Sequence, residues 1–285
     1  MREAFPVSED VVRYYNQTWA DYRVIWLSRV NYAFHFGYHD QPRMPHKRAL
    51  VRHNEVMADI AQVAPGDRVL DAGCGVGGTS CWLAEQRGAT VVGITVVPDQ
   101  VERARVIAAR RGVTHSATFE VADYLRIPYP DASFDVVWVQ ESLCHSADKA
   151  AAYREFHRVL RPGGRLVVAE YMCTTRALSP LDSRIVRAWL AGWMMPDLDT
   201  FEEHRDCATT IFDQVEVRNA TLFVRPSLQR LFFRSAVLYP LAVLLRLLRV
   251  RSATQHGNVR ASVLQYLALR RAAWGYGILS AKRRC

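Results

Sequence analysis

The spacing of hydrophobic positions changes near residue 60 of this 285-residue chain. Before that point, the sequence is rich in aromatic side chains and predicts helices. The segment HFGYHDQPRMP at residues 35–45, which contains glycine and prolines, predicts a loop between them. From residue 67 onward, short apolar runs alternate with amphipathic stretches. The apolar runs predict strands at residues 67–73, 89–95, 117–123, 134–140, 165–172, 213–223 and 274–283. The amphipathic stretches predict helices at residues 79–88, 98–112, 148–164, 183–194 and 200–212.

This alternation determines the expected architecture. Strands and helices that follow one another in strict order are typical of a parallel sheet covered on both faces. We therefore predict an α/β fold with a doubly wound, mostly parallel, seven-stranded sheet. We expect a helical N-terminal cap at 1–63, the core at 64–225, a helical insertion at 226–271, and the last strand and tail at 272–285. The cap and the insertion should pack over the carboxyl edge of the sheet.

The stretch from Pro226 to Arg251 is both apolar and basic. Arg234, Pro240 and Arg246 interrupt it within the ~20 residues that a membrane span requires, so spanning is disfavoured. Two short helices meeting at Pro240 are expected instead. Their apolar face would contain Leu241, Leu244, Leu245 and Leu248. An apolar face beside basic residues is typical of a helix at a membrane interface. An ordinary lid helix packed on the core is the other interpretation.

The charge distribution supports an anionic partner for this part of the chain. The net charge is +9, from 37 basic and 28 acidic residues. From Arg218 to the end there are 13 basic and no acidic residues, which leaves 37 − 13 = 24 bases against 28 acids elsewhere, a net of −4. A membrane surface, a nucleic acid or an acidic ligand would each match this asymmetry, and so would a solvated basic face.

The cysteines and the N-terminus indicate a cytoplasmic protein. The six cysteines show no CxxC motif and no zinc-type spacing, so we expect reduced thiols and no metal site. Charged residues stand where a signal peptide would be apolar.

The segment VLDAGCGVGG places Gly73, Gly75 and Gly77 between the first predicted strand and the first helix. Glycines at this point allow a tight turn and a close approach of the backbone to a ligand. Dinucleotide-binding proteins share such glycines, but a P-loop is disfavoured because no lysine follows them.

Two carboxylates narrow the choice of ligand. Asp71 stands two residues before the first glycine, where it can brace the loop or accept a hydrogen bond from a ligand ammonium group. Asp123 ends the third strand, where an adenine amino group can donate to it. The G-x-G-x-G spacing also differs from the G-x-G-x-x-G that receives a pyrophosphate. Together these features predict S-adenosylmethionine, an adenosine with an amino-acid tail.

Residues 66–171 resemble the core of the class I S-adenosylmethionine-dependent methyltransferases, in the glycine loop, in Asp123 and in the turn RVLRPGGRLV at 158–167. The segments FHFGYHD (34–40), GIT (93–95), ESLCHSAD (141–148) and NATLFVRPSL with GYGILSAK resemble the branch with tocopherol and sterol methyltransferases. The resemblance implies the Rossmann-like methyltransferase fold. It also implies that Gln100 holds the ribose, since Thr95 stands where most class I enzymes have an acid. The expected cofactor-binding residues are Asp71, Gly73, Gly75, Gly77, Thr95, Gln100, Asp123, Tyr124 and Glu141.

Glu141 and His145 follow the buried strand Phe134–Val139. They are four residues apart, so one helical turn would bring them side by side. Ligands of open α/β sheets bind outside the carboxyl ends of the strands, so both side chains are candidate catalytic groups. His145 could act as a base toward a hydroxyl acceptor, and Glu141 could orient His145 or balance a cation. A capped turn with a satisfied buried histidine is the other interpretation.

The function predicted is methyl transfer to a lipophilic small molecule of terpenoid, sterol-like or prenylated quinol type. Aromatic residues before the core are expected to form the substrate lid, although only two or three of them should touch the substrate: Tyr14, Tyr15, Trp19, Phe34 and Tyr38. Carbon, nitrogen and oxygen acceptors are all compatible with these residues. Two rival functions are a nucleic-acid methyltransferase and a methyltransferase-like enzyme that catalyses a cyclisation or rearrangement. A nucleic-acid substrate is not expected, because the basic residues alternate with leucine and phenylalanine.

Overall fold

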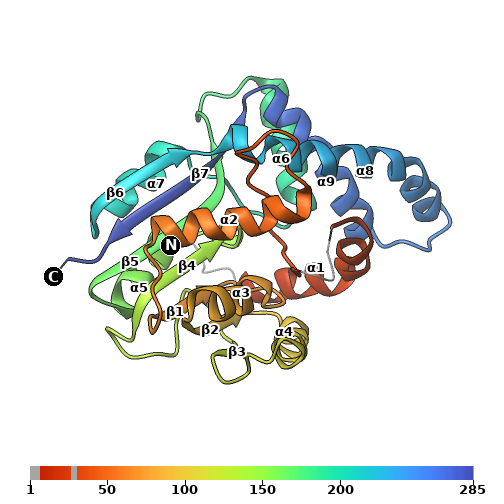
Figure 1. Ribbon diagram of the computed structural model, residues 1–285. Coiled ribbons are helices and arrows are strands. Elements are labelled where there is room, and N and C mark those ends of the chain that lie inside the picture. Colours follow the sequence, from red (N-terminus) through yellow and green to blue (C-terminus); the bar gives the residue numbers. More distant parts are fainter. Residues whose placement is uncertain (1–6, 27–30, 285) are drawn as a thin grey trace.

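The computed structural model describes residues 7–26 and 31–284, and its centre is one seven-stranded sheet (Figure 1). The strands lie in the order β3-β2-β1-β4-β5-β7-β6. Their bounds are β1 Arg68–Ala72, β2 Thr90–Thr95, β3 Ala117–Val121, β4 Phe134–Gln140, β5 Leu160–Cys173, β6 Asp213–Asn219 and β7 Trp274–Lys282. Only β7 runs against its neighbours, β5 and β6, among these strands. The predicted fold class, a doubly wound and mostly parallel sheet, is confirmed.

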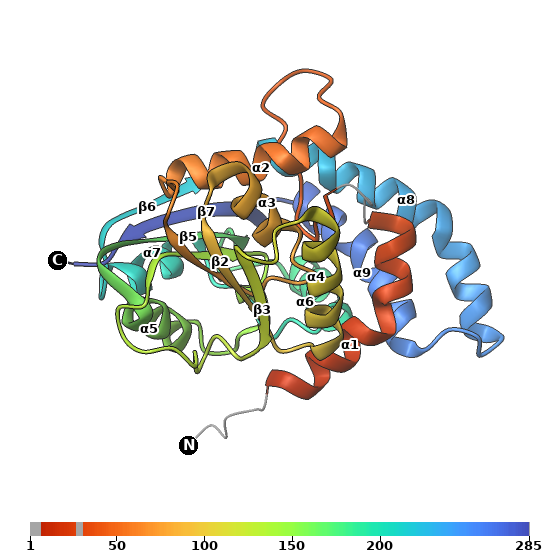
Figure 2. The same cartoon turned by 60° about the horizontal axis from the view of Figure 1, so that its bottom comes forward.

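The sheet is covered by helices on both faces, as Figures 1 and 2 show. The covering helices are α2 His46–Ile60, α3 Gly78–Arg87, α4 Pro98–Arg111, α5 Lys149–Val159 and α7 Phe201–Thr209. Neighbouring strand residues point to opposite faces and join different cores. Val136 belongs to the core shared with Leu83 of α3, whereas Val137 belongs to the core shared with Phe156 of α5. Both faces are therefore buried, which explains the continuous apolar runs in the sequence.

The remaining helices gather at one end of the sheet. They are α1 Val7–Asp21, the π-helical turn Tyr22–Trp26, α6 Pro180–Gly192, α8 Thr221–Leu247 and α9 Ala253–Arg270. α9 packs against α1, α6 and α8 and lies at the centre of this group. The N-terminal and C-terminal parts of the chain thus build one helical layer beside the carboxyl ends of β1 and β4.

Three predicted elements differ from the structure. α8 is one continuous helix that contains Pro226 and Pro240, rather than two short helices meeting at Pro240. A proline removes one backbone donor and bends a helix without necessarily ending it. α8 also begins at Thr221, whose backbone N–H donates to the Asn219 side chain, so the predicted strand to residue 223 is too long. The expected domain boundary at residue 226 consequently falls inside a helix.

The predicted helix at 148–164 is also too long. α5 ends at Val159, and the segment RPGG belongs to the long strand β5. Leu160 already has an extended backbone and pairs with Phe134 of β4, and the residue before Pro162 disfavours a helical backbone.

Candidate active site

Two cavities meet beside the carboxyl ends of β1 and β4. The first has a volume of about 850 Å³, including space open to solvent, and is lined by the glycine loop and the ends of β2 and β3. The second has a volume of about 710 Å³, also including space open to solvent, and lies beneath α1, α8 and α9. Four residues line both cavities: Tyr15, Phe34, Glu141 and His145. This junction is where a group bound in one cavity can reach a molecule in the other.

The glycine loop forms the floor of the first cavity. Gly73 has φ +95°, and a Cβ atom there would lie 2.2 Å from the Cβ of Ser142, so no other residue fits. Gly75 has φ +54°, and the nearest atom to an added Cβ is the Cδ2 of Phe34 at 3.4 Å. Gly77 does not line the cavity, because it packs against the ring of Phe119 at the start of α3. An added Cβ at Gly77 would lie 2.7 Å from the ring of Phe119, so a glycine is needed there for packing, and its role in cofactor binding stays a prediction.

Asp71 lies below this loop and is almost fully buried. Its carboxylate accepts a 2.5 Å hydrogen bond from the Ser80 hydroxyl. Burial raises the pKa of Asp71 to about 7, and the Ser80 hydrogen bond opposes that shift. A cationic ligand in the cavity would favour the ionised form.

The ends of β2 and β3 provide polar groups for an adenosine. The Thr95 hydroxyl donates to Oε1 of Gln100 at 2.7 Å, which leaves the amide N–H groups of Gln100 as donors. Oδ1 of Asp123 accepts from the backbone N–H of Leu125 at 2.8 Å. The Tyr124 hydroxyl donates to the carbonyl of Ser142 at 3.1 Å. All four side chains line the first cavity, at the positions where the sequence predicts cofactor contacts.

Glu141 accepts three hydrogen bonds at the junction. The donors are the backbone N–H of Phe36 at 2.7 Å, the Tyr171 hydroxyl at 2.5 Å and the Tyr276 hydroxyl at 2.8 Å. Burial raises the pKa of Glu141 to about 7, and the three donors oppose the shift. The residue adopts φ +53°, a left-handed conformation that is uncommon outside glycine. Backbone strain of this kind clusters at functional sites.

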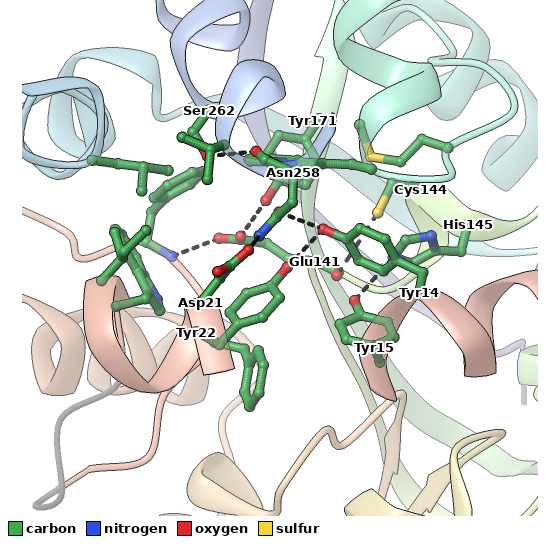
Figure 3. Close-up of a pocket in the computed structure, with 18 residues that line it drawn as sticks. Tyr14, Tyr15, Asp21, Tyr22, Glu141, Cys144, His145, Tyr171, Asn258 and Ser262 are labelled. Atoms are coloured by element: carbon green, nitrogen blue, oxygen red, sulfur yellow. Dashed lines mark hydrogen bonds between the residues drawn. The ribbon is translucent and has the colours of Figure 1, made fainter. Parts of the chain in front are cut away.

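His145 lies in the 3₁₀ turn Leu143–His145 and faces α1. Its Nδ1 is 3.3 Å from the carbonyl oxygen of Met194, which can only accept, so Nδ1 carries the proton. Nε2 therefore accepts from the Tyr15 hydroxyl at 3.0 Å (Figure 3). Burial lowers the pKa of His145 to about 4, so the imidazole is neutral at physiological pH.

The predicted Glu141–His145 pair does not form a hydrogen bond. The segment after β4 is not an α-helix, because Glu141 is left-handed and only Leu143–His145 forms a helical turn. Both side chains nevertheless line the junction, each with its own partners.

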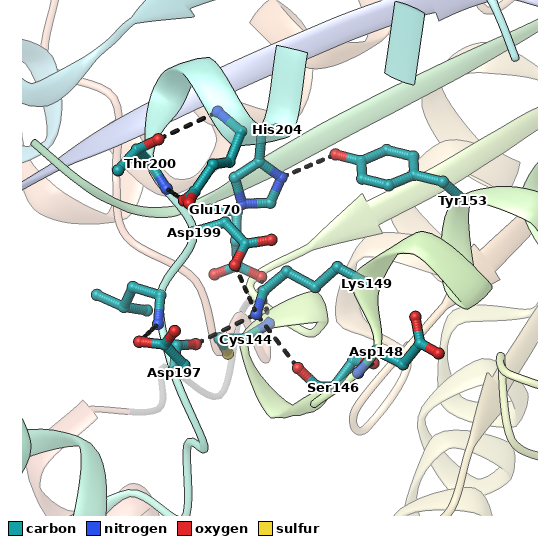
Figure 4. A network of polar contacts seen from close by, with 12 residues as sticks. Cys144, Ser146, Asp148, Lys149, Tyr153, Glu170, Asp197, Asp199, Thr200 and His204 are labelled. Carbon is teal, nitrogen blue, oxygen red and sulfur yellow. Dashed lines mark hydrogen bonds and ion pairs between the residues drawn. The ribbon is translucent and has the colours of Figure 1, made fainter. Parts of the chain in front are cut away.

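A buried polar network holds the segment that carries His145 (Figure 4). Glu170 of β5 is fully buried and accepts from the backbone N–H groups of Cys144 and Tyr171, both at 2.8 Å. Burial raises the pKa of Glu170 to about 8. Lys149 donates to the carbonyls of Ser146 and Asp197, both at 3.2 Å. Neither residue was expected at the site from the sequence, although a glutamate inside the apolar run RLVVAEYM is a visible signal.

The second cavity is lined mainly by aromatic and aliphatic side chains. Tyr14, Tyr15 and Phe34 line it, as the lid prediction requires. Trp19 does not line either cavity, and the Arg103 guanidinium lies 4.2 Å above its ring. Tyr38 is also outside, because it stacks on Phe223 with ring centroids 4.4 Å apart. The lining residues that the sequence did not indicate include Tyr22, Phe36, Tyr171, Trp193 and Asn258.

One polar group of this cavity joins α1 to α9. The Tyr14 hydroxyl donates to Oδ1 of Asn258 at 2.8 Å, and Nδ2 of Asn258 donates to Asp21 at 3.1 Å. Arg251 forms a 2.7 Å salt bridge with the same carboxylate. The buried charge of Asp21 is thereby paired, and the N-terminal helix is fixed over the cavity.

Comparisons with known proteins agree with this geometry. Residues 70–168 match the family model described as a methyltransferase domain. Methyltransferase GfsG of Streptomyces halstedii is 40% identical over 172 residues, which are 60% of this chain and 60% of that protein. The chloroplastic tocopherol O-methyltransferase of Arabidopsis thaliana is 36% identical over 209 residues, which are 66% of this chain and 59% of that protein. The chain thus spans about three fifths of the length of these curated relatives.

Among solved structures, the 4+2 cyclase SpnF has a TM-score of 0.81 at 25% identity, covering 98% of this chain and 97% of that one. Residues 70–168 therefore belong to a methyltransferase domain with a Rossmann-like fold. The chain carries a class I S-adenosylmethionine-dependent methyltransferase domain of the small-molecule type, to which tocopherol and sterol methyltransferases also belong. S-adenosylmethionine is the cofactor of this domain. The predicted family, enzyme class and cofactor are confirmed.

Proposed function

We propose that this protein transfers a methyl group from S-adenosylmethionine to a hydroxyl of a lipophilic small molecule, of terpenoid, sterol-like or prenylated aromatic type. The observation that carries the proposal is the junction of the two cavities at Tyr15, Phe34, Glu141 and His145. One cavity offers carboxylates and amides to a cofactor, and the other offers aromatic walls to an apolar acceptor. The reacting groups would meet where both cavities share the same side chains.

The residues of the first cavity fit the cofactor in charge and shape. The carboxylate of Asp71 would pair with the ammonium group, and that of Glu141 would lie beside the sulfonium. Gln100 would bond to the ribose hydroxyls, and Asp123 would accept from the adenine amino group. When bound, S-adenosylmethionine supplies an electrophilic methyl group. The protein then needs only to align a nucleophile and exclude water.

His145 is suited to accept the proton of a hydroxyl acceptor. In its neutral form Nε2 has a lone pair, which accepts a hydrogen bond from the Tyr15 hydroxyl; the oxygen lies 3.0 Å from Nε2. The acceptor hydroxyl would replace Tyr15 as the donor, and the oxygen would gain nucleophilic character as its proton moves to Nε2. Met194 would hold the other side of the ring through its carbonyl. An ionised Glu141 would offset the positive charge on the imidazole.

The names of relatives include both oxygen and carbon methyltransferases. The Arabidopsis relative is a tocopherol O-methyltransferase. Relatives from rice and Aspergillus fumigatus are sterol C-methyltransferases. With an alkene acceptor, the aromatic faces and Glu141 would instead stabilise a carbocation.

A second candidate function is a cyclisation without methyl transfer. Its support is the match to the cyclase SpnF along 98% of the chain. The same cofactor cavity would then hold S-adenosylmethionine as a structural group, and the aromatic cavity would fold an unsaturated substrate.

One experiment separates these functions. The purified protein is incubated with methyl-labelled S-adenosylmethionine and a lipid extract, and the products are analysed by mass spectrometry. Methyl transfer predicts a labelled lipophilic product together with an equal amount of S-adenosylhomocysteine. A methylated product that has lost one exchangeable hydroxyl proton assigns oxygen as the acceptor. A product of unchanged mass, formed without S-adenosylhomocysteine, would refute methyl transfer and support cyclisation.

A further inference from the structure

The solvent-facing side of α8 is apolar where a surface helix is normally polar. Phe233, Val237, Leu241, Leu244 and Leu248 are between 51% and 77% exposed. Their spacing of three or four residues places them in one row along the helix. We call this row the α8 stripe. Single exposed hydrophobic residues are ordinary, but a continuous row indicates a surface that something covers.

The stripe is not the core-facing side of α8. The opposite side is already packed, because Val224, Leu228 and Leu231 are buried. Phe232 packs on Tyr266 of α9 with ring centroids 4.8 Å apart. Figures 1 and 2 show α8 at the outer edge of the helical layer, with α9 on its inner side. The stripe therefore points away from the rest of the molecule.

The charged residues of α8 and of the segment that follows it are all positive. Residues 221–251 contain six arginines and no acidic residue. Arg251 pairs with Asp21, and Arg234 donates to the carbonyl of Ile25. In contrast, Arg230, Arg246 and Arg249 are exposed, and no salt bridge joins them to any residue within 7–26 or 31–284.

We propose that the α8 stripe docks on an anionic lipid bilayer, with the leucines and Phe233 in the interface and the arginines at the headgroups. An exposed apolar row flanked by arginines binds a bilayer through buried apolar area together with attraction to anionic lipids. A second copy of this chain fits less well, because a symmetric contact would bring the same uncompensated arginines toward each other. The protein would be a peripheral, cytoplasmic one.

A transmembrane role for α8 does not fit its packing. By length and composition α8 is long and apolar enough to cross a membrane, with a mean hydropathy of 1.3 in its most apolar window. Core helices of soluble proteins pass the same test, so this property alone is weak support. The packed side of α8 also forms part of the acceptor cavity through Leu231. Spanning the membrane would expose that side to lipid, whereas lying on the surface leaves it in place.

Docking through the stripe would also bring the acceptor cavity close to acceptor molecules dissolved in the bilayer; this point rests on the proposed function. Leu231 of α8 and Asn258, Val259 and Ser262 of α9 line the acceptor cavity. The packed side of α8 and the neighbouring helix α9 thus form a wall of the cavity. A lipophilic acceptor dissolved in the bilayer could enter beside them without crossing water.

The test is co-sedimentation of the full-length protein with vesicles. One set contains phosphatidylcholine with about one third phosphatidylglycerol, and the other contains phosphatidylcholine alone. We expect binding to the anionic set at low salt, weaker binding to the neutral set, and weaker binding as salt is added. The double variant Leu241→Glu/Leu244→Glu should weaken binding by about tenfold or more, since two leucine side chains leave the lipid and two negative charges enter.

A matched control carries the same change elsewhere on the surface. Val106 of α4 and Leu181 of α6 are 49% and 53% exposed, so Val106→Glu/Leu181→Glu adds equal charge outside the stripe. The control should bind vesicles within about threefold of the wild type. An equal loss in both double variants would overturn the proposal, because the effect would then be one of net charge.

Two further outcomes would also overturn the proposal. One is that the wild type stays in the supernatant with anionic vesicles at low salt. The other is that light scattering shows dimers, which Leu241→Glu/Leu244→Glu dissociates, while no vesicle binding is seen; the stripe would then be a contact between copies of the chain.

The binding of S-adenosylmethionine, by calorimetry, and methyl transfer in detergent are measured on the same proteins. Vesicle binding without methyl transfer would refute the proposed function and leave the docking surface standing.

Discussion

The affinity for S-adenosylmethionine should fall as the pH is lowered from 8 to 6. Asp71 and Glu141 line the cofactor cavity, and burial raises the pKa of each carboxyl to about 7. Among the described residues, no lysine or arginine lines this cavity to neutralise them. A ligand that carries a sulfonium and an ammonium group favours the ionised carboxylates. Protons therefore compete with the ligand, and the competition is strongest below pH 7.

The magnitude follows from the two pKa values. A carboxyl with a pKa of about 7 is roughly nine-tenths ionised at pH 8 and roughly one-tenth ionised at pH 6. If the ligand requires one ionised carboxylate, the dissociation constant rises about tenfold over this range, and if it requires both, about a hundredfold.

Isothermal titration calorimetry in two buffers of different ionisation enthalpy measures both the affinity and the protons released. S-adenosylhomocysteine is the matched control ligand, because it keeps the ammonium group but has no charge on sulfur. Its affinity should fall only about tenfold, as should that of S-adenosylmethionine for Glu141→Gln. A change of less than about threefold for S-adenosylmethionine, or equal slopes for the two ligands, would refute the placement of Glu141 beside the sulfonium.

Three further predictions concern single residues. Gly75→Asp should abolish S-adenosylmethionine binding while the fold is kept, since an added Cβ has space there; Gly112→Asp, also at a left-handed glycine but with nothing within 4 Å, should bind normally, and equal binding by both would contradict the assigned loop. His145→Ala should lower the turnover number by about 10²–10⁴-fold with cofactor affinity unchanged, whereas Tyr15→Phe should stay within about threefold of the wild type; a small effect of His145→Ala would exclude its role as base. Glu170→Gln should melt below the wild type at pH 5, because both carboxyl oxygens of Glu170 accept a backbone N–H and an amide nitrogen cannot replace one of them. The difference should shrink or reverse at pH 9, because a carboxyl whose pKa is raised to about 8 loses its stabilising contribution as the pH rises; a melting difference independent of pH would show that Glu170 is not titrating there.

The sequence predicted the sheet well because each strand and helix carries its own signal. Apolar runs of five to seven residues, Pro98 at the start of α4 and Gly112 after its end are local features, and the structure reproduces them. α8 was predicted less well, since its continuity past Pro240 depends on packing against α9 rather than on local propensity.

The candidate site could be predicted in part. The glycine loop, Asp71 and Asp123 lie at strand ends, so their positions follow from the alternation of strands and helices alone. The hydrogen-bond partners of Glu141 could not be predicted in this way, because Phe36, Tyr171 and Tyr276 come from three distant segments. The aromatic lid shows the same limit. Trp19 and Tyr38 lie at helical or loop positions like those of Tyr15 and Phe34, and only tertiary packing decides which side chains face the cavity.

A crystal structure of the protein with S-adenosylmethionine tests the central claim most directly. The account predicts adenosine beside Asp123 and Gln100, and a sulfonium methyl group within about 5 Å of both Glu141 and His145, pointing into the aromatic cavity. A cofactor bound with its methyl group directed away from that cavity, or outside the glycine loop, would contradict the proposal that methyl transfer takes place at the junction of the two cavities.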